Sequence, residues 1–257
     1  MIPERLVPGT AEWRLYIPEH RQRYEFFAAE CAGKSVLDAA CGVGYGSRML
    51  AEAGAASVLG VDLSEQALAL ARTQFAHPRV EYARRDVALL DGLGPFDRVI
   101  SFETIEHVAE PELFVRAVRR AIADDGLFVC STPNRDFHDQ SKESNPYHLS
   151  CMGFEEFAAV FGKYFQIEAQ YQQSHSVSYL RHIALVKELD RIRKRVEFSR
   201  ILRLENRLRK ILGREIPDSA RPSEFVQEGI PDDFVIEPLT SPSDQPVTYI
   251  LTGRPIR

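Results

Sequence analysis

The chain has 257 residues, of which 44% are hydrophobic and 27% charged, with 15 glycines and 15 prolines. This globular composition excludes a collagen, a disulfide-rich miniprotein and a wholly disordered chain. No apolar run approaches the roughly 20 residues that a membrane-spanning helix needs. The first residues also lack the basic and apolar regions of a secretory signal. Four cysteines without a CxxC spacing are typical of reduced thiols in the cytosol.

Charge is distributed unevenly along the chain. Residues 176–214 hold 12 Lys and Arg against 4 acidic residues, which gives this segment a net charge of +8. Because the whole chain carries −5, the remainder carries −13. Such an acidic body lacks the broad basic footprint of a protein that binds duplex nucleic acid.

Short apolar runs alternate with helical patterns over the first 175 residues. The alternation predicts a mostly parallel sheet covered on both faces by helices. Right-handed crossovers make such a sheet doubly wound, and its ligand lies beyond the carboxyl ends of the strands. The predicted strands are residues 35–39, 57–62, 79–83, 96–102, 126–131 and 165–169, and the intervening helices begin near residues 42, 64, 111 and 154.

The pattern changes after residue 175. Apolar residues recur at helical spacing from 178 to about 212, which predicts one or two basic amphipathic helices. Six prolines between 217 and 246 predict an extended, mostly irregular segment, and residues 247–252 return to a strand pattern. The expected organisation is an N-terminal helical lid (1–34), a core (35–175), a basic helical insertion with a proline-rich segment (176–245), and a terminal strand (246–257).

A glycine-rich run follows the first predicted strand and reads Asp38-Ala39-Ala40-Cys41-Gly42-Val43-Gly44-Tyr45-Gly46. At a strand-to-helix junction, glycines let a ligand approach the backbone and the N–H groups of the helix. A tight turn alone would also explain them. The run lacks the Gly-Lys-Ser/Thr of a Walker loop and departs from the dinucleotide spacing G-x-G-x-x-G. Asp38 would repel a pyrophosphate, but it suits the ammonium group of an amino-acid tail.

Acidic residues stand at the ends of the next two predicted strands. Asp62 is placed to accept hydrogen bonds from both hydroxyls of a ribose, and Asp86 is placed to meet an adenine edge. Each could instead cap a helix. With the glycine-rich run, these residues resemble the class I S-adenosylmethionine-dependent methyltransferases, over residues 35 to about 170 and the terminal strand.

The resemblance implies a Rossmann-like sheet of seven strands whose last strand is antiparallel, with S-adenosylmethionine as cofactor. Ala40 stands where the family usually has glycine, and Leu63 and Val87 would sandwich the purine. The cofactor contacts that the resemblance implies are Asp38, Ala40, Gly42, Gly44, Asp62, Leu63, Asp86, Val87 and Phe102.

The fourth strand leads into Glu103-Thr104-Ile105-Glu106-His107. The spacing i, i+3, i+4 places Glu103, Glu106 and His107 on one face of a helical turn. One interpretation is a solvated first turn with Glu favoured by the helix dipole; His107 or His148 is then a general base. The other is a site for Mg²⁺ or Mn²⁺ formed by these three residues, with His148 as fourth ligand and His138 in reserve.

This order of motifs resembles three methyltransferase branches, which act on small-RNA 2′-hydroxyls, on ubiquinone precursors and on bacterial sugars. Their shared chemistry is a vicinal diol, one oxygen of which a chelating metal would acidify. The resemblance favours a cytoplasmic enzyme that methylates a sugar hydroxyl of a glycan, nucleotide sugar or glycosylated metabolite, as in polysaccharide biosynthesis. RNA ribose or a catechol-type quinone precursor is the alternative acceptor, and a cofactor-binding scaffold is the non-enzymatic alternative.

Further residues are expected to contact the acceptor or a partner. Trp13 and Tyr16 are expected to form a lid that stacks on a sugar ring, with Phe26 and Phe27 in the core. Asn134 and Tyr147 are expected substrate contacts. The basic helices favour a homodimer or a packing role; the alternatives are a collar for a phosphate-bearing acceptor, peripheral membrane contact and small-RNA binding.

Overall fold

The computed structural model describes residues 6–136, 147–175, 234–239 and 246–256. Its described residues up to Ser174 and from Phe234 onward form one compact unit. The predicted basic helices over 178–212 and the reserve ligand His138 lie outside the described residues. No helix in the described ranges combines the length and the apolar character that crossing a bilayer requires.

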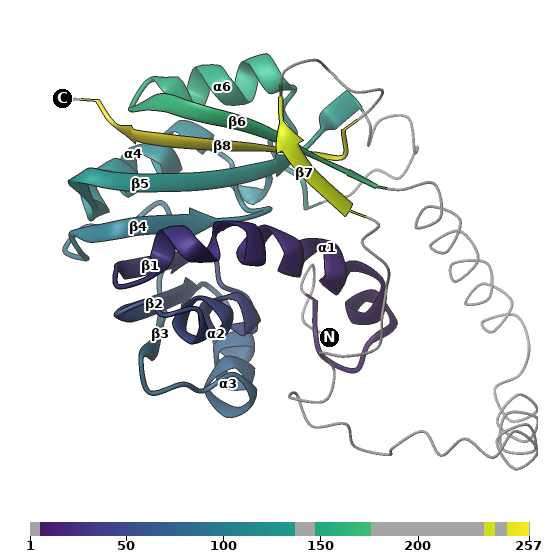
Figure 1. Cartoon of the computed structure of the whole chain (residues 1–257), viewed down its shortest axis with the longest axis vertical. Helices are drawn as coiled ribbons and strands as arrows, with labels where there is room; N and C mark the ends of the chain where they lie inside the picture. Colours follow the sequence, from purple (N-terminus) through teal and green to yellow (C-terminus); the bar gives the residue numbers. More distant parts are fainter. Residues whose placement is uncertain (1–5, 137–146, 176–233, 240–245, 257) are drawn as a thin grey trace, which may run out of the picture. The chain divides into compact units, whose positions relative to one another are not determined.

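A single sheet runs through this unit, with the strand order β3-β2-β1-β4-β5-β8-β6-β7 (Figure 1). Strands β1 to β5 pair in parallel, and β8 pairs antiparallel with both β5 and β6. The predicted doubly wound fold with an antiparallel last strand is therefore confirmed. The strands are β1 (Ser35–Ala39), β2 (Ser57–Asp62), β3 (Val80–Arg84), β4 (Phe96–Ser101), β5 (Ile122–Pro133), β6 (Phe165–His175), β7 (Phe234–Pro238) and β8 (Thr248–Pro255).

The described part of the sheet has eight strands, one more than the seven expected. The additional strand, β7, falls in the proline-rich segment that was expected to be irregular. Its Phe-Val-Ile core favours an extended backbone, and its edge position tolerates the proline at its end. Phe234 is buried, and its carbonyl accepts a hydrogen bond from Gln22 Nε2 at 2.6 Å.

Local sequence signals account for the helix boundaries. Thr10 caps α1 by accepting a hydrogen bond from the Trp13 amide at 3.1 Å, and Ser64 caps α3 in the same way. Pro111 opens α4 in its first turn. The helices are α1 (Ala11–Phe27), α2 (Tyr45–Glu52), α3 (Glu65–Gln74), α4 (Pro111–Ala121) and α6 (Phe154–Gly162), with 3₁₀ turns η1 (Ala28–Cys31) and η2 (Ile105–His107).

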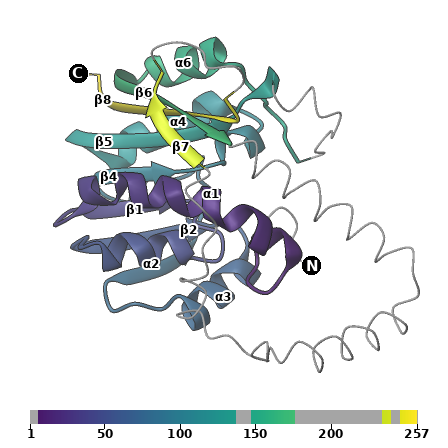
Figure 2. The same cartoon turned by 45° about the vertical axis from the view of Figure 1, so that its right-hand side comes forward.

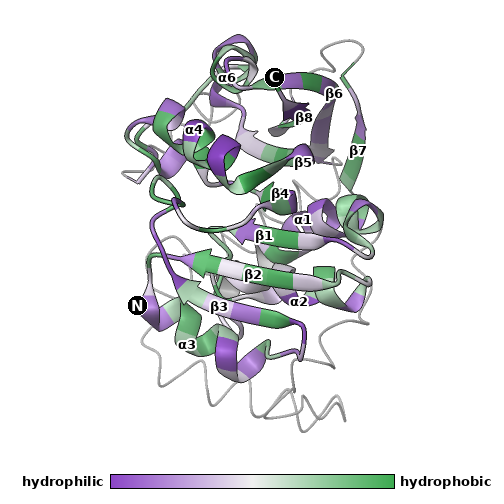
Figure 3. Ribbon diagram, turned by 90° about the vertical axis from the view of Figure 1, so that its left-hand side faces the viewer, coloured by the Kyte–Doolittle hydropathy of each residue, from purple (hydrophilic) through white to green (hydrophobic). Residues whose placement is uncertain are grey.

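Hydrophobic cores lie on both faces of the sheet. On one face α1 and α2 pack against the strands through Tyr24, Phe27 and Leu50, and both helices are visible on the same side in Figure 2. On the other face α4 and α6 pack through Phe114 and Phe161. Figure 3 shows hydrophobic residues along the central strands β1 and β2, as expected for strands buried on both faces.

The parallel order β2-β1-β4-β5 brings the carboxyl ends of four strands to one edge of the sheet. Hydrogen bonds join neighbouring strand ends there. Ser101 Oγ donates to the Ala39 carbonyl at 3.0 Å, and the Glu103 amide donates to Ser131 Oγ at 3.0 Å. The residues predicted to form a site after β1, β2 and β4 are therefore neighbours.

Candidate functional site

The loop after β1 depends on left-handed backbone conformations. Gly42 and Gly44 have φ values of 58° and 89°, and Ala40 has a φ of 67°. Such values suit glycine, whereas an L-residue is strained there. The alanine at the first position therefore carries a backbone strain that glycine would avoid. A Cβ atom on Gly42 would meet nothing within 4 Å, so the loop faces open space at this point.

The third glycine of the loop makes room for α1 and not for a ligand. A Cβ atom on Gly46 would lie 2.1 Å from the ring of Tyr24. The Tyr24 hydroxyl donates to Asp38 Oδ1 at 3.0 Å, and Ser47 Oγ donates to Asp38 Oδ2 at 2.6 Å. Asp38 is fully buried, and burial raises the pKa of its carboxyl to about 6. Protein donors thus already bind both oxygens of Asp38. Its contact with an amino-acid ammonium group stays a prediction.

The acidic residues after β2 and β3 make contacts of the capping kind. Asp62 Oδ2 accepts from the Gly42 amide at 3.1 Å, and Asp62 Oδ1 accepts from the Ser64 amide at 2.7 Å. Asp86 Oδ1 accepts from the Ala88 amide at 2.9 Å. These bonds fix the loops that follow β2 and β3. The ribose and adenine contacts stay predictions.

The two residues expected against the purine differ in exposure. Leu63 is 54% exposed, whereas Val87 is buried at 7%. Phe102, expected among the cofactor contacts, is also buried, with its ring 5.0 Å from that of Tyr24. Leu63 thus presents an apolar surface beside the carboxyl end of β2. Val87 and Phe102 belong to the core in this arrangement.

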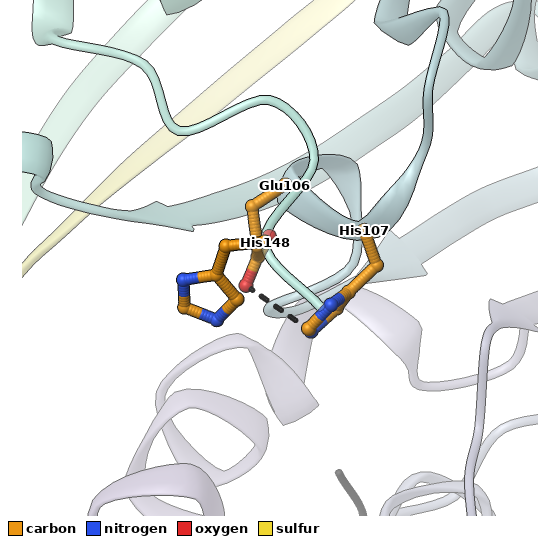
Figure 4. Close-up of side chains that lie close together, drawn as sticks. All are labelled: Glu106, His107 and His148. Carbon is orange, nitrogen blue, oxygen red and sulfur yellow. Dashed lines mark ion pairs between the residues drawn. The ribbon is translucent and has the colours of Figure 1, made fainter. Parts of the chain in front are cut away.

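Glu106, His107 and His148 form a cluster whose ligand atoms lie within 4.8 Å of one another (Figure 4). Glu106 Oε1 is 3.8 Å from His107 Nε2. His107 Nδ1 contacts the Tyr147 carbonyl at 3.0 Å, and His148 Nδ1 contacts Cys151 Sγ at 3.4 Å. These outer contacts orient both imidazoles, as the outer partners of metal-ligating histidines do.

The segment that carries His148 is fastened beside η2. The amides of Leu149 and Ser150 donate to the Glu106 carbonyl at 2.8 and 3.0 Å, and Ser150 Oγ donates to the carbonyls of Ile105 and Val108. Tyr147 and Leu149, on either side of His148, are 48% and 62% exposed. The segment around His148 is thus joined to η2, about 40 positions earlier in the sequence. The exposed side chains of Tyr147 and Leu149 form an apolar surface beside it.

Glu103 does not join this cluster, contrary to the expected metal site of Glu103, Glu106 and His107. The 3₁₀ turn η2 begins at Ile105, and Glu103 precedes it with a φ of 50°, so no helical turn aligns the two glutamates. Glu103 Oε1 instead lies 2.7 Å from Ser131 Oγ and 3.0 Å from Arg23 Nη1. The cause is tertiary, because Ser131 of β5 binds the Glu103 amide and turns the backbone there.

Arg23 of α1 lies in the N-terminal segment that was expected to form a lid, but no individual role was predicted for it. Its side chain is fully buried and faces Glu103 at 3.0 Å and Glu19 at 3.6 Å. None of its three guanidinium nitrogens makes a directed hydrogen bond to a protein acceptor. A buried guanidinium with unused N–H groups is costly unless a ligand engages them. An arginine within the aromatic run Arg-Tyr-Glu-Phe-Phe was the sequence signal that could have found it.

The predicted lid residues are mostly covered. Trp13 is 7% exposed and packs against Tyr45 and Phe75, with ring centroids 5.5 and 6.2 Å away, so it presents no open face to a sugar. Tyr16 is half-buried. Phe26, expected in the core, is 44% exposed, whereas Phe27 is buried as expected.

Asn134, an expected substrate contact, instead joins β5 to the start of β8. It is 4% exposed, and its Nδ2 donates to the Pro246 carbonyl at 2.8 Å. Its Oδ1 accepts from the Asp136 amide at 3.0 Å. Protein partners thus bind both the nitrogen and the oxygen of the Asn134 side-chain amide. A substrate role for this residue stays a prediction.

Comparison with known families places these features in context. The model of a family described as "Methyltransferase domain" matches residues 13–183. A protein named "Probable S-adenosylmethionine-dependent methyltransferase" from Mycolicibacterium smegmatis is 35% identical over 148 residues, 56% of this chain and 56% of that protein. The chain therefore spans little more than half the length of the first curated relatives that it matches.

Two further similarities are to a curated ubiquinone biosynthesis enzyme and to a solved structure. The ubiquinone biosynthesis O-methyltransferase of Caulobacter sp. is 37% identical over 107 residues, 40% of this chain and 42% of that enzyme. A crystal structure titled S-adenosylmethionine dependent methyltransferase from Mesorhizobium loti superposes with a TM-score of 0.53 at 19% identity. That match covers 96% of this chain and 98% of the other. At this identity the superposition supports the fold alone.

Proposed function

Because the chain belongs to the S-adenosylmethionine-dependent methyltransferases, we propose that it methylates one hydroxyl of a vicinal diol with the help of a divalent cation. The acceptor class we propose is a sugar, such as a glycan, nucleotide sugar or glycosylated metabolite. The observation that carries the cation is the cluster of Glu106, His107 and His148 at the carboxyl edge of the sheet.

The residues at the carboxyl edge fit the cofactor. The open space at Gly42 and the exposed face of Leu63 provide room for it, and the N–H groups of buried Arg23 suit its carboxylate. Asp62 is proposed for the ribose hydroxyls. When bound, S-adenosylmethionine supplies an activated methyl group on a sulfonium, and positioning the acceptor oxygen in line with it provides much of the rate.

The cluster of Glu106, His107 and His148 fits a divalent cation. One carboxylate and two imidazoles form a donor set that suits Mn²⁺ and other transition ions better than Mg²⁺, which prefers oxygen ligands. When bound, the cation supplies positive charge that favours an acceptor alkoxide. Glu106 is 1% exposed, so its charge gains from such a partner.

A catechol-type acceptor is the second candidate. It is supported by the similarity to a ubiquinone biosynthesis O-methyltransferase and by the exposed Tyr147 and Leu149 beside His148, which offer apolar contact to an aromatic ring. Sugar and catechol share the vicinal diol, so the same cluster would serve either.

The deciding experiment is a methyl-transfer screen over nucleotide sugars, oligosaccharides, catechols and short RNA. Each is assayed after exhaustive chelation and again with Mn²⁺ or Mg²⁺ restored. We expect transfer only with the cation present, and Glu106→Gln should resemble the chelated enzyme. Glu110→Gln, an exposed position four residues further on, is the matched control and should keep full activity. Undiminished transfer after chelation would assign the chemistry to His107 or His148 as a simple base.

Location and partners are also proposals. None of the four cysteines (Cys31, Cys41, Cys130 and Cys151) is in a disulfide bond, which supports the proposal that the protein works in the reducing cytoplasm. Residues 178–212 lie outside the described residues, so the proposed homodimer through them and the phosphate-binding alternative depend on the sequence alone. Size measurement by sedimentation would test the dimer.

A further inference from the structure

The Glu103-x-x-Glu106-His107 motif divides between two tasks. Glu106 and His107 lie in the cluster with His148, whereas the Glu103 carboxylate lies against Arg23. The two glutamates are three residues apart in the sequence, yet they face different groups. This division suggests that Glu103 acts on the cofactor side of the site.

One serine hydroxyl holds both the backbone and the side chain of Glu103. Ser131 Oγ accepts from the Glu103 amide at 3.0 Å and donates to Glu103 Oε1 at 2.7 Å. Ser131 is fully buried. The φ of 50° at Glu103 lies in the left-handed region, where a glutamate is strained. Ser131 therefore holds Glu103 in a strained conformation that places its carboxylate beside Arg23.

The Arg23 guanidinium lies beside two carboxylates. Nη1 lies 3.0 Å from Glu103 Oε1, and Nη2 lies 3.6 Å from Glu19 on the preceding turn of α1. The guanidinium also interacts electrostatically with Tyr45 at the start of α2 and with Glu106. The carboxylates of Glu103 and Glu19 balance the charge of Arg23. Its guanidinium nitrogens make no directed hydrogen bond to a protein acceptor, so their N–H groups can donate to a ligand.

We propose that Glu103, held by Ser131, is a positioning residue that fixes Arg23 where its guanidinium binds the carboxylate of the cofactor's methionine end. The inference rests on the proposed function, since it takes S-adenosylmethionine as the ligand. In this proposal Glu103 is not a metal ligand, and its strained backbone conformation directs its carboxylate toward Arg23.

The test compares two ligands that differ in the methionine end. Calorimetry measures binding of S-adenosylhomocysteine, which has the carboxylate, and of 5′-methylthioadenosine, which lacks it. Glu103→Gln and Ser131→Ala should weaken binding of the first ligand about tenfold, or about 1.4 kcal/mol, and change binding of the second less than about twofold. Arg23→Lys should show the same selectivity, since it keeps the charge but loses the fork geometry.

Two further measurements separate positioning from general damage. Glu103→Gly relieves the backbone strain while removing the carboxylate, so the melting temperature should hold or rise while S-adenosylhomocysteine binding weakens. Mn²⁺ binding should be unchanged in Glu103→Gln and lost in Glu106→Gln.

Three outcomes would overturn the inference: unchanged S-adenosylhomocysteine binding in the Glu103 variants, equal loss for both ligands, or loss of Mn²⁺ binding in Glu103→Gln. The last would make Glu103 a metal ligand. The proposed function fails separately, if the wild-type protein binds neither ligand or transfers no methyl group to any diol.

Discussion

The hydroxyl of Tyr24 in α1 donates a hydrogen bond to Asp38 Oδ1 near the end of β1, at a distance of 3.0 Å. The other carboxylate oxygen accepts from Ser47 of α2 at 2.6 Å. Three elements therefore meet at one buried carboxylate, and the ring of Tyr24 occupies the space where Gly46 has no side chain. The N-terminal helix is thus tied to the glycine loop through specific polar and steric contacts.

The first prediction concerns this steric fit. Gly46→Ala places a methyl group 2.1 Å from the Tyr24 ring and should lower the free energy of unfolding by roughly 1–3 kcal/mol, as overpacking does. In a Tyr24→Ala background the same change should be neutral or stabilising, because alanine is the better helix former. Urea unfolding of the four proteins gives the double-mutant cycle. Equal costs in both backgrounds would show that Gly46 does not serve Tyr24.

Ala40 gives the second prediction. Its φ of 67° costs an L-residue roughly 1–2 kcal/mol, while glycine gains about 0.5–1 kcal/mol of extra freedom in the unfolded chain. Ala40→Gly should therefore raise the free energy of unfolding by about 0.5–1 kcal/mol. The control is Ala159→Gly, at an exposed position inside α6, which should lower it by about 1 kcal/mol. A loss of stability at both positions would contradict the strain at Ala40.

The sequence was sufficient for the features that depend on local pattern. Apolar runs predicted β1 to β6 and β8, and parallel topology correctly brought the glycine loop and Asp62 to one edge. Asp62 was also recognised as either a ligand residue or a cap, and the structure shows cap-type bonds at both of its oxygens. Such predictions succeed because strand periodicity and turn chemistry are encoded within a few residues.

Features that depend on distant partners were not predictable. The spacing of Glu103 and Glu106 indicated one helical face, but Ser131 of β5 binds the Glu103 amide and delays the turn. The role of Arg23 depends on a carboxylate 80 positions away. The strand β7 forms in a proline-rich segment because the edge of β6 lies next to it. In each case a tertiary contact overrides the local pattern.

The third prediction concerns Asp62. Asp62→Asn keeps one acceptor oxygen and replaces the other by a donor, so either the Gly42 or the Ser64 amide loses its charged acceptor. The free energy of unfolding should fall by about 1–3 kcal/mol, and S-adenosylhomocysteine binding should weaken roughly tenfold if the carboxylate also binds the ribose. Asp91→Asn, an exposed control, should change neither quantity. Reduced stability with undiminished binding would leave Asp62 a structural cap.

The last prediction is a pH dependence with two opposing parts, both near α1. Burial raises the pKa of Asp38 from 3.8 to about 6. Burial, with the nearby Arg23 charge, lowers the pKa of His20 from 6.5 to about 4. Between about pH 4 and 6 the folded state binds the Asp38 proton more tightly than the unfolded state, so this contribution to stability falls as pH rises. For His20 the unfolded state binds more protons, so its contribution is complete above pH 6.5 and is lost as pH falls toward 4.

The two contributions should nearly cancel in the wild-type protein, so single substitutions should reveal them. On going from pH 6.5 to 4, His20→Gln should gain stability relative to the wild type, by up to about 3 kcal/mol at 1.36 kcal/mol per pKa unit. Asp38→Asn should lose stability relative to the wild type over about pH 6 to 4. Other titrating groups cancel in these differences, which urea unfolding at pH 4, 5, 6 and 7 measures. A His20→Gln difference that stays constant with pH would mean that His20 keeps its ordinary pKa and is solvated beside Arg23.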